Sequence, residues 1–189
     1  MKRLFNPDRS MMTLVRYGCI LVISIMVVSA CQTATIKAYH ILPRYQGEEL
    51  GPRATIRYIT DENERAAMKL YVHNGLLTDQ QGRLLDPATD QFPRRDGLAI
   101  YVMDLQKQIF ISFDHEQNRF HHSSILAGQP VLAAGDMTIV QGRLLELSNS
   151  SGHYRPAPQS LDLVIHQLRS LGVAMESVKI VAIDGSDKH

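Results

Sequence analysis

The sequence predicts an α+β domain in which an antiparallel β-meander carries one late amphipathic helix. Short segments rich in branched and aromatic residues fill the middle of the chain, and polar turns separate them. One helical stripe follows near the end, and a last apolar strand comes after it. This order favours a single sheet with the helix packed on one face. The length of 189 residues is typical of one domain with an adequate core.

The first expected elements are short. Residues 54–59 form a strand candidate, and the capping box Asp61-x-x-Glu64 predicts a helix over 62–67. Residues 68–73 then alternate as a strand does. Further strands are expected at 76–78 and 83–86, beside the turn signals Asn74-Gly75 and Gln81-Gly82.

The meander is expected over the middle of the chain, in five strands at residues 98–104, 108–113, 119–126, 131–140 and 143–147. The late helix begins at Ser160, a good N-cap, and Gly172 is a natural C-terminal cap. Its apolar stripe is Leu161, Val164, Ile165, Leu168 and Leu171. The final strand, 178–183, is apolar on both faces apart from Lys179, which predicts a central place in the sheet.

The composition excludes some functions. Twenty Lys and Arg against 19 Asp and Glu give a net charge of +1, which argues against a nucleic-acid binder with a broad basic face. Two cysteines cannot build a disulfide scaffold or a four-cysteine zinc site. We therefore expect no nucleic-acid partner, no metal and no cofactor.

The N-terminus has the pattern of a secretory signal peptide: four basic residues precede an apolar run at 18–28 that is shorter than a membrane span. The end of this run, Val28-Ser29-Ala30-Cys31, resembles the lipobox of bacterial lipoproteins. That resemblance implies cleavage before Cys31 and acylation of its thiol, with palmitate-type chains anchoring the protein in the bilayer. Gln32, next in the sequence, then implies the outer membrane, facing the periplasm.

These patterns divide the chain into four parts. Residues 1–30 are the expected signal peptide, 31–53 the lipidated cysteine with a tether, 54–184 one globular α+β domain, and 185–189 a tail. Besides the bilayer, the expected partner is an unidentified ligand or protein of the cell envelope.

Two segments concentrate side chains that can do chemistry. Residues 120–135 read FHHSSILAGQPVLAAG and residues 149–156 read NSSGHYRP. They flank a predicted hairpin, which returns the chain to its starting end, so we expect them to meet. The candidate catalytic residues are His122, Ser123, His153 and Tyr154, with either histidine as general acid or base.

The residues leave four interpretations open. A metal site would use His121, His122 and His153 with Asp114 or His115, although neighbouring histidines on a strand point to opposite faces. A nucleophilic site would pair Ser123, Ser124 or Ser151 with His122 or His153. An ADP-ribosyltransferase-like cleft would use His122, Ser123, Tyr154 and Glu146. In the fourth, these side chains only satisfy backbone groups in tight loops.

Residues 61–178 also resemble a module of plant IQ-motif proteins that occurs in some bacterial secreted and toxin-like proteins. The resemblance lies in GLLTDQQGRLLD, AIYVMD, FHHSSILAGQPVLAAGD and SNSSGHYRP. The calmodulin-binding IQ motif of those proteins lies outside the module, so we expect no calmodulin partner. The sequence thus predicts an envelope lipoprotein with a binding or structural module of unknown ligand, or else a transferase or hydrolase that uses the His/Ser/Tyr pocket.

Overall fold

The computed structural model describes residues 36–51, 54–87 and 97–184. The predicted leader, Cys31 and the predicted tail lie outside these ranges. The elements in chain order are η1 (Pro43–Tyr45), α1 (Glu62–Ala67), β1 (Tyr71–His73), β2 (Leu76–Thr78), β3 (Leu98–Met103), β4 (Ile109–Ser112), α2 (His122–Ile125), β5 (Ala133–Val140), β6 (Arg143–Ser148), α3 (Ser160–Ser170) and β7 (Lys179–Val181). Within the described ranges, no helix is both long and apolar enough to cross a bilayer.

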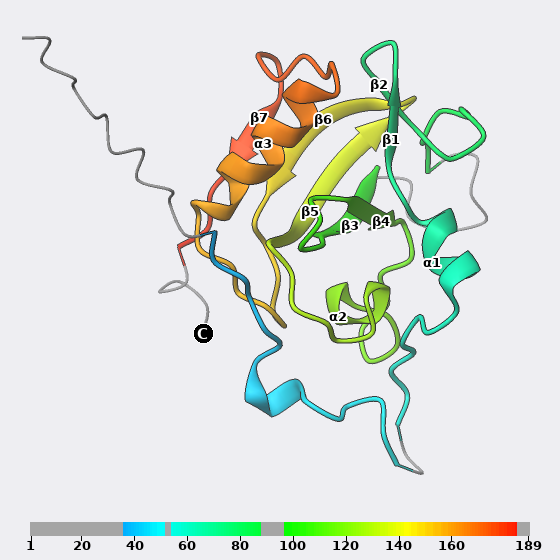
Figure 1. The fold of residues 1–189 in the computed structure, drawn as a ribbon, viewed down its shortest axis with the longest axis vertical. Coiled ribbons are helices and arrows are strands. Elements are labelled where there is room, and N and C mark those ends of the chain that lie inside the picture. The colour runs from blue at the N-terminus through cyan, green and yellow to red at the C-terminus, as the bar shows by residue number, and fades with distance from the viewer. Residues whose placement is uncertain (1–35, 52–53, 88–96, 185–189) are drawn as a thin grey trace, which may run out of the picture. The chain divides into compact units, whose positions relative to one another are not determined.

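The main sheet has five strands in the order β4-β3-β5-β6-β7 (Figure 1). Its strands are antiparallel except for the parallel pair β6–β7. Strands β1 and β2 form a separate two-stranded hairpin. The predicted α+β class is confirmed: a largely antiparallel sheet carries one late amphipathic helix.

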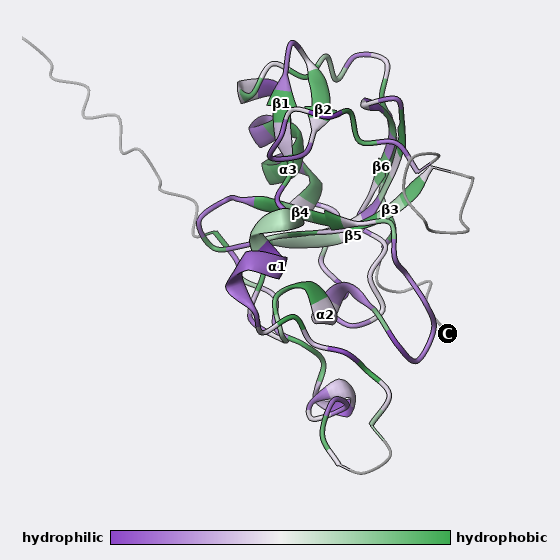
Figure 2. Cartoon of the chain, turned by 90° about the vertical axis from the view of Figure 1, so that its right-hand side faces the viewer, coloured by the Kyte–Doolittle hydropathy of each residue, from purple (hydrophilic) through white to green (hydrophobic). Residues whose placement is uncertain are grey.

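Strand β3 divides the core into two apolar clusters because its side chains alternate between the two faces of the sheet. Tyr101 and Met103 belong to the cluster that includes the buried stripe of α3. Ile100 and Val102 belong to the second cluster, which includes Ile125 of α2. All four β3 side chains are fully buried, and Figure 2 shows α3 and α2 on opposite sides of the sheet. The second face carries the candidate site.

Two strand predictions are wrong in an informative way. Residues 119–126 contain the short helix α2, whose N-cap is His121, and the His121 amide donates to Ser124 Oγ at 3.0 Å. The hydroxyl satisfies an amide that would otherwise need a strand partner, so local capping outweighs β propensity. The final strand lies at the sheet edge instead of the centre, and Ile180 is 40% exposed.

The other differences concern short segments. Residues 54–59 form no strand, and residues 83–86 contribute only the isolated bridge between Thr78 and Leu84. A segment of four to six residues gains too little from its own propensity to fix its pairing, and the surrounding packing decides it.

Gly135 lies where β5 passes the end of β6, and a side chain there has no room. A Cβ added to Gly135 would lie 1.9 Å from the Ser148 carbonyl oxygen, whereas one added to Gly152 would meet nothing within 4 Å. We therefore expect Gly135→Ala to lower the free energy of unfolding by about 3 kcal/mol, as for severe overpacking. Urea titration measures this loss. Gly152→Ala is the matched control and should change stability by less than about 0.5 kcal/mol; equal effects would contradict the account.

Candidate functional site

The chain segment before α1 crosses the α2 face of the sheet and brings an acidic residue there. Tyr39 and Val131 exchange backbone hydrogen bonds of 2.7 and 2.9 Å, and the Leu42 amide donates to the His153 carbonyl at 2.9 Å. Ile41 belongs to the second core cluster. This segment, blue to cyan in Figure 1, descends to the left of α2 into η1, and the chain after η1 then runs below α2 in that view. The region predicted as a tether thus includes residues that contact the domain.

Glu48, just after η1, is the centre of the polar cluster. Ser123 Oγ donates to Glu48 Oε1 at 2.9 Å, and His153 Nε2 lies 3.2 Å from Glu48 Oε2. The Tyr58 hydroxyl donates to Glu48 Oε1 at the longer distance of 3.5 Å. The Glu48 side chain is 15% exposed and Ser123 is fully buried. One carboxylate therefore joins α2, the loop before α3 and the segment before α1.

Three stacked rings include the histidine that contacts the Glu48 carboxylate. The His153 ring lies between Tyr45 at 4.1 Å and His121 at 4.6 Å, and both pairs are within 30° of parallel. His115 lies 6.0 Å from the rings of both His121 and His122. The stack fixes the plane of the His153 imidazole and so directs Nε2 at Glu48.

The other two predicted catalytic residues bind backbone carbonyls. His122 Nε2 lies 2.9 Å from the Gly135 carbonyl oxygen and 3.6 Å from Asp136 Oδ1. The Tyr154 hydroxyl donates to the Gln129 carbonyl at 2.8 Å. Both side chains are buried. Of the four residues predicted as catalytic, Ser123 and His153 share a partner. His122 bonds to strand β5, and Tyr154 bonds to the loop before that strand.

Burial controls the protonation of the cluster. Desolvation lowers the pKa of His153, although the adjacent Glu48 carboxylate acts in the opposite direction. Desolvation, followed by repulsion from His153, lowers the pKa of His121 to about 4. Burial and then the carboxylate of Glu48 raise the pKa of Tyr58 to about 12. At neutral pH both imidazoles are uncharged and the phenol keeps its proton, so His153 Nε2–H can donate to Glu48.

This arrangement differs from a catalytic triad. In a triad the imidazole lies between the hydroxyl and the carboxylate, so that it can take the hydroxyl proton. Here the carboxylate of Glu48 lies between Ser123 and His153. The hydroxyl donates directly to a carboxylate, which is a weak base, and no open surface adjoins Ser123 Oγ because the residue is fully buried. The cluster is suited to joining chain segments.

Other members of the sets proposed from the sequence make different contacts. Glu146 of the ADP-ribosyltransferase-like set forms an ion pair with Lys179 Nζ at 2.7 Å, where β6 meets β7. Ser124 accepts from the amide of His121, the N-cap of its own helix, and Ser151 accepts from the amide of Tyr154. Among the residues that the structure describes, no three His, Cys, Asp or Glu side chains are grouped as a metal site requires.

Glu48 itself could not be found by motif reasoning. It lies 75 positions before Ser123 and 105 before His153, in a segment without sustained periodicity. The available signals were the short apolar patch at residues 39–42 and the neighbouring Glu48-Glu49 pair. An apolar patch in a supposed tether indicates packing against the domain.

These contacts define a class: an α+β domain whose polar cluster is internal and joins chain segments far apart in the sequence. Comparison with known proteins then shows the family to which the chain belongs. Residues 64–161 match the family described as "IQ motif-containing protein middle domain". The chain belongs to this family.

Several similar proteins are from Arabidopsis thaliana. The chain is 40% identical to IQ domain-containing protein IQM3 over 91 residues, which cover 48% of the chain and 20% of that relative. It is 30% identical to IQ domain-containing protein IQM5 over 135 residues, which cover 71% of the chain and 26% of the relative. The matches thus span about a fifth to a quarter of these relatives. No solved structure matches.

The relatives correct two predictions. The chain was predicted to be a bacterial outer-membrane lipoprotein that binds the bilayer through an acylated Cys31. This prediction conflicts with the relatives, which are plant IQ domain-containing proteins. The expectation of no calmodulin partner is also contradicted, because the relatives are IQ domain-containing proteins, a class associated with calmodulin binding. The boundaries at residues 30 and 53 and the cell-envelope location stay predictions.

His121 gives the fold a specific dependence on pH. Its pKa is about 4 in the folded chain and 6.5 as the ordinary value, so between these two pH values the unfolded chain binds a proton that the folded chain does not. The free energy of unfolding must therefore fall as the pH is lowered from about 6.5 to about 4. His121→Phe keeps a ring beside His153 and removes the titration, so its stability should fall less over this interval. Urea titrations across that range measure both slopes, and equal slopes would contradict the assignment.

Proposed function

We propose that this chain is a non-catalytic interaction module of the IQ-motif class. The observation that carries the proposal is the use of the Glu48 carboxylate by both Ser123 and His153. Groups that would act on a substrate instead hold the domain together. The fold presents a well-packed scaffold, and such scaffolds usually carry binding surfaces on their loops and edges.

Family membership supports a partner class. The relatives are IQ domain-containing proteins, and this class is associated with calmodulin binding. The proposal therefore includes calmodulin as a partner of the chain. Because the matched region is only part of each relative, this partner is inferred from the class and not from any one contact surface.

Both parts of the proposal can be tested with the full chain. A fluorophosphonate probe labels activated serines and should leave Ser123 unlabelled, because its buried hydroxyl already donates to Glu48; intact-mass spectrometry measures the label. Calorimetric titration with calmodulin, with calcium and with chelator, should show saturable binding in at least one condition. Labelling of Ser123 would contradict the non-catalytic role, and no heat in either titration would contradict the partner.

A further inference from the structure

A groove of about 330 Å³ lies where three parts of the chain meet: β1 with the two residues before it, the turn between β3 and β4, and the C-terminal end of α3. Leu70 and Ile109 line it, and both belong to the core cluster that includes the stripe of α3. Figure 2 shows β1 and α3 on the same side of the sheet. The groove is therefore built on packed core side chains, and its volume is at the lower end of the range for ligand sites.

Part of the groove lining is apolar and stays open to solvent. Leu171, the C-cap of α3, is 44% exposed, whereas Leu168 of the same stripe is fully buried. Tyr71 and Val72 of β1 are half-buried and also line the groove. Ligand sites are lined mainly by side chains of this kind, with a few polar groups that fix the orientation of the ligand.

The charged residues of the lining are both cations. Lys69 and Lys107 line the groove, and no Asp or Glu among the described residues does. Neither lysine takes part in the ion pairs between described residues. Lys69 Nζ instead lies 5.5 Å from the centre of the Tyr71 ring. Asp104, in the turn that carries Lys107, accepts from two backbone amides of that turn. The groove thus offers two ammonium groups that no described carboxylate contacts.

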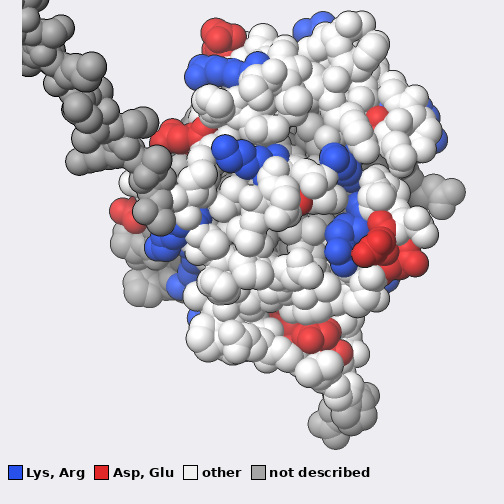
Figure 3. Space-filling view, in the orientation of Figure 1, with Lys and Arg blue, Asp and Glu red and all other residues white. Residues whose placement is uncertain are grey.

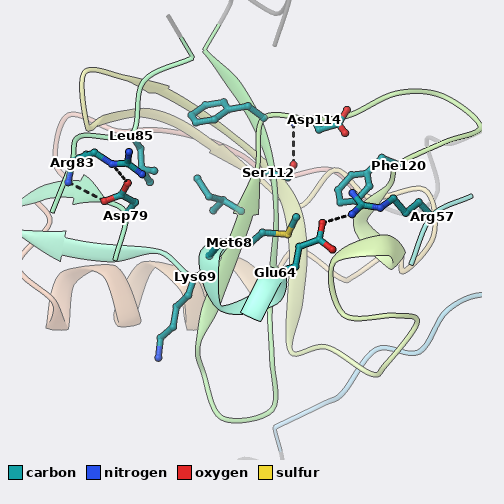
Figure 4. A pocket seen from close by; sticks show the side chains of 13 residues that line it. Arg57, Glu64, Met68, Lys69, Asp79, Arg83, Leu85, Ser112, Asp114 and Phe120 are labelled. Carbon is teal, nitrogen blue, oxygen red and sulfur yellow. Dashed lines mark hydrogen bonds and ion pairs between the residues drawn. The ribbon is translucent and has the colours of Figure 1, made fainter. Parts of the chain in front are cut away.

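The cavity beside β4, drawn in Figure 4, has a different arrangement of charge. Arg83 pairs there with Asp79 at 2.6 Å, and Arg57 pairs with Glu64. Figure 3 shows such paired charges, blue beside red, on the α1 side of the molecule. Lys69 also borders this cavity, but Figure 4 shows its side chain pointing away from both carboxylates. Charge complementarity therefore favours an anion in the groove beside α3 and not in the cavity beside β4.

The end of α3 adds little negative charge to the groove, because its last carbonyls already accept hydrogen bonds. The Gln167 carbonyl accepts from the Ser170 hydroxyl and the Leu171 amide, and the Leu168 carbonyl accepts from the Val173 amide. Side-chain amides, which can donate to a carboxylate, complete the polar lining. These are the amides of Gln106, Gln108 and Gln167.

From these observations we propose that the groove beside α3 binds a small carboxylic acid with an apolar body, in its ionised form. The carboxylate pairs with Lys69 and Lys107, and the apolar body covers Leu171 and contacts Tyr71 and Val72. The two cations favour an anion, and the apolar lining favours one with a carbon body over an inorganic ion such as phosphate. The inference goes beyond the proposed interaction function, since it requires neither calmodulin nor the Glu48 cluster.

The probes are 4-phenylbutyrate and octanoate, titrated into the full chain and followed by NMR of the backbone amides. At least one of them should bind saturably with a Kd below about 1 mM. The shifts should be largest at residues 69–72, 106–109 and 167–171. The uncharged analogue 4-phenylbutyramide lacks the carboxylate and acetate lacks the apolar body, so each should bind at least about fivefold more weakly.

Substitutions separate the two parts of the site. Lys69→Gln and Lys107→Gln should each raise Kd about threefold and together about tenfold, because each removes one ion pair near the surface. Lys37→Gln is the matched control: Lys37 Nζ lies 5.2 Å from the Tyr39 ring, as Lys69 lies over Tyr71, but Lys37 is not part of the groove. Its Kd should stay unchanged. Leu171→Gln should weaken the acids at least about fivefold, and circular dichroism shows whether each variant folds as the wild type does.

Several results would overturn the proposal. These are no saturable binding of either acid up to about 10 mM, equal binding of 4-phenylbutyramide, shifts confined to other parts of the domain, or equal effects of Lys37→Gln and the double lysine variant. The two proposals fail separately. If calmodulin binds while the acids do not, only this inference fails; if the acids bind while calmodulin does not, only the proposed calmodulin partner fails.

Discussion

The arrangement of the α2 face depends on one carboxylate. Glu48 accepts from Ser123 and lies within hydrogen-bond distance of His153, and these residues belong to parts of the chain more than 70 positions away. Ser123 and His153 are both buried. Without the Glu48 carboxylate, each would keep a buried polar group with neither water nor protein to bond to. Buried polar networks of this kind favour one arrangement of the chain, because any other arrangement would leave their polar groups without hydrogen bonds.

The sheet provides the frame on which this contact is built. β3 buries side chains on both faces, which gives the molecule one cluster beneath α3 and another beneath α2. The second cluster includes Ile41, so the apolar part of the N-terminal segment and its acidic part are fixed on the same face. The family match over residues 64–161 includes β3 and α2 but neither Ile41 nor Glu48, and most of each relative's length lies outside the matched region.

The sequence predicted those features that arise from local patterns. The late helix followed from its stripe and caps, and the strands β3 to β6 followed from alternation and turn residues. The edge position of β7 did not follow, because apolar content does not determine strand order. Ser123 and His153 were found as candidates from polar residues flanking a hairpin. Glu48, and with it the role of the cluster, depends on pairing across a long loop, which no local pattern encodes.

The most direct test of the central claim is hydrogen exchange of the Tyr39 and Leu42 amides in Glu48→Ala, with Glu49→Ala as the matched control. Among the described residues, Glu49 Oε2 has no hydrogen-bond partner. The account predicts at least about tenfold faster exchange and a loss of about 2 kcal/mol in the free energy of unfolding for Glu48→Ala, with little change for the control. Unchanged exchange in Glu48→Ala, or equal effects of both variants, would contradict the claim that Glu48 holds this segment on the domain.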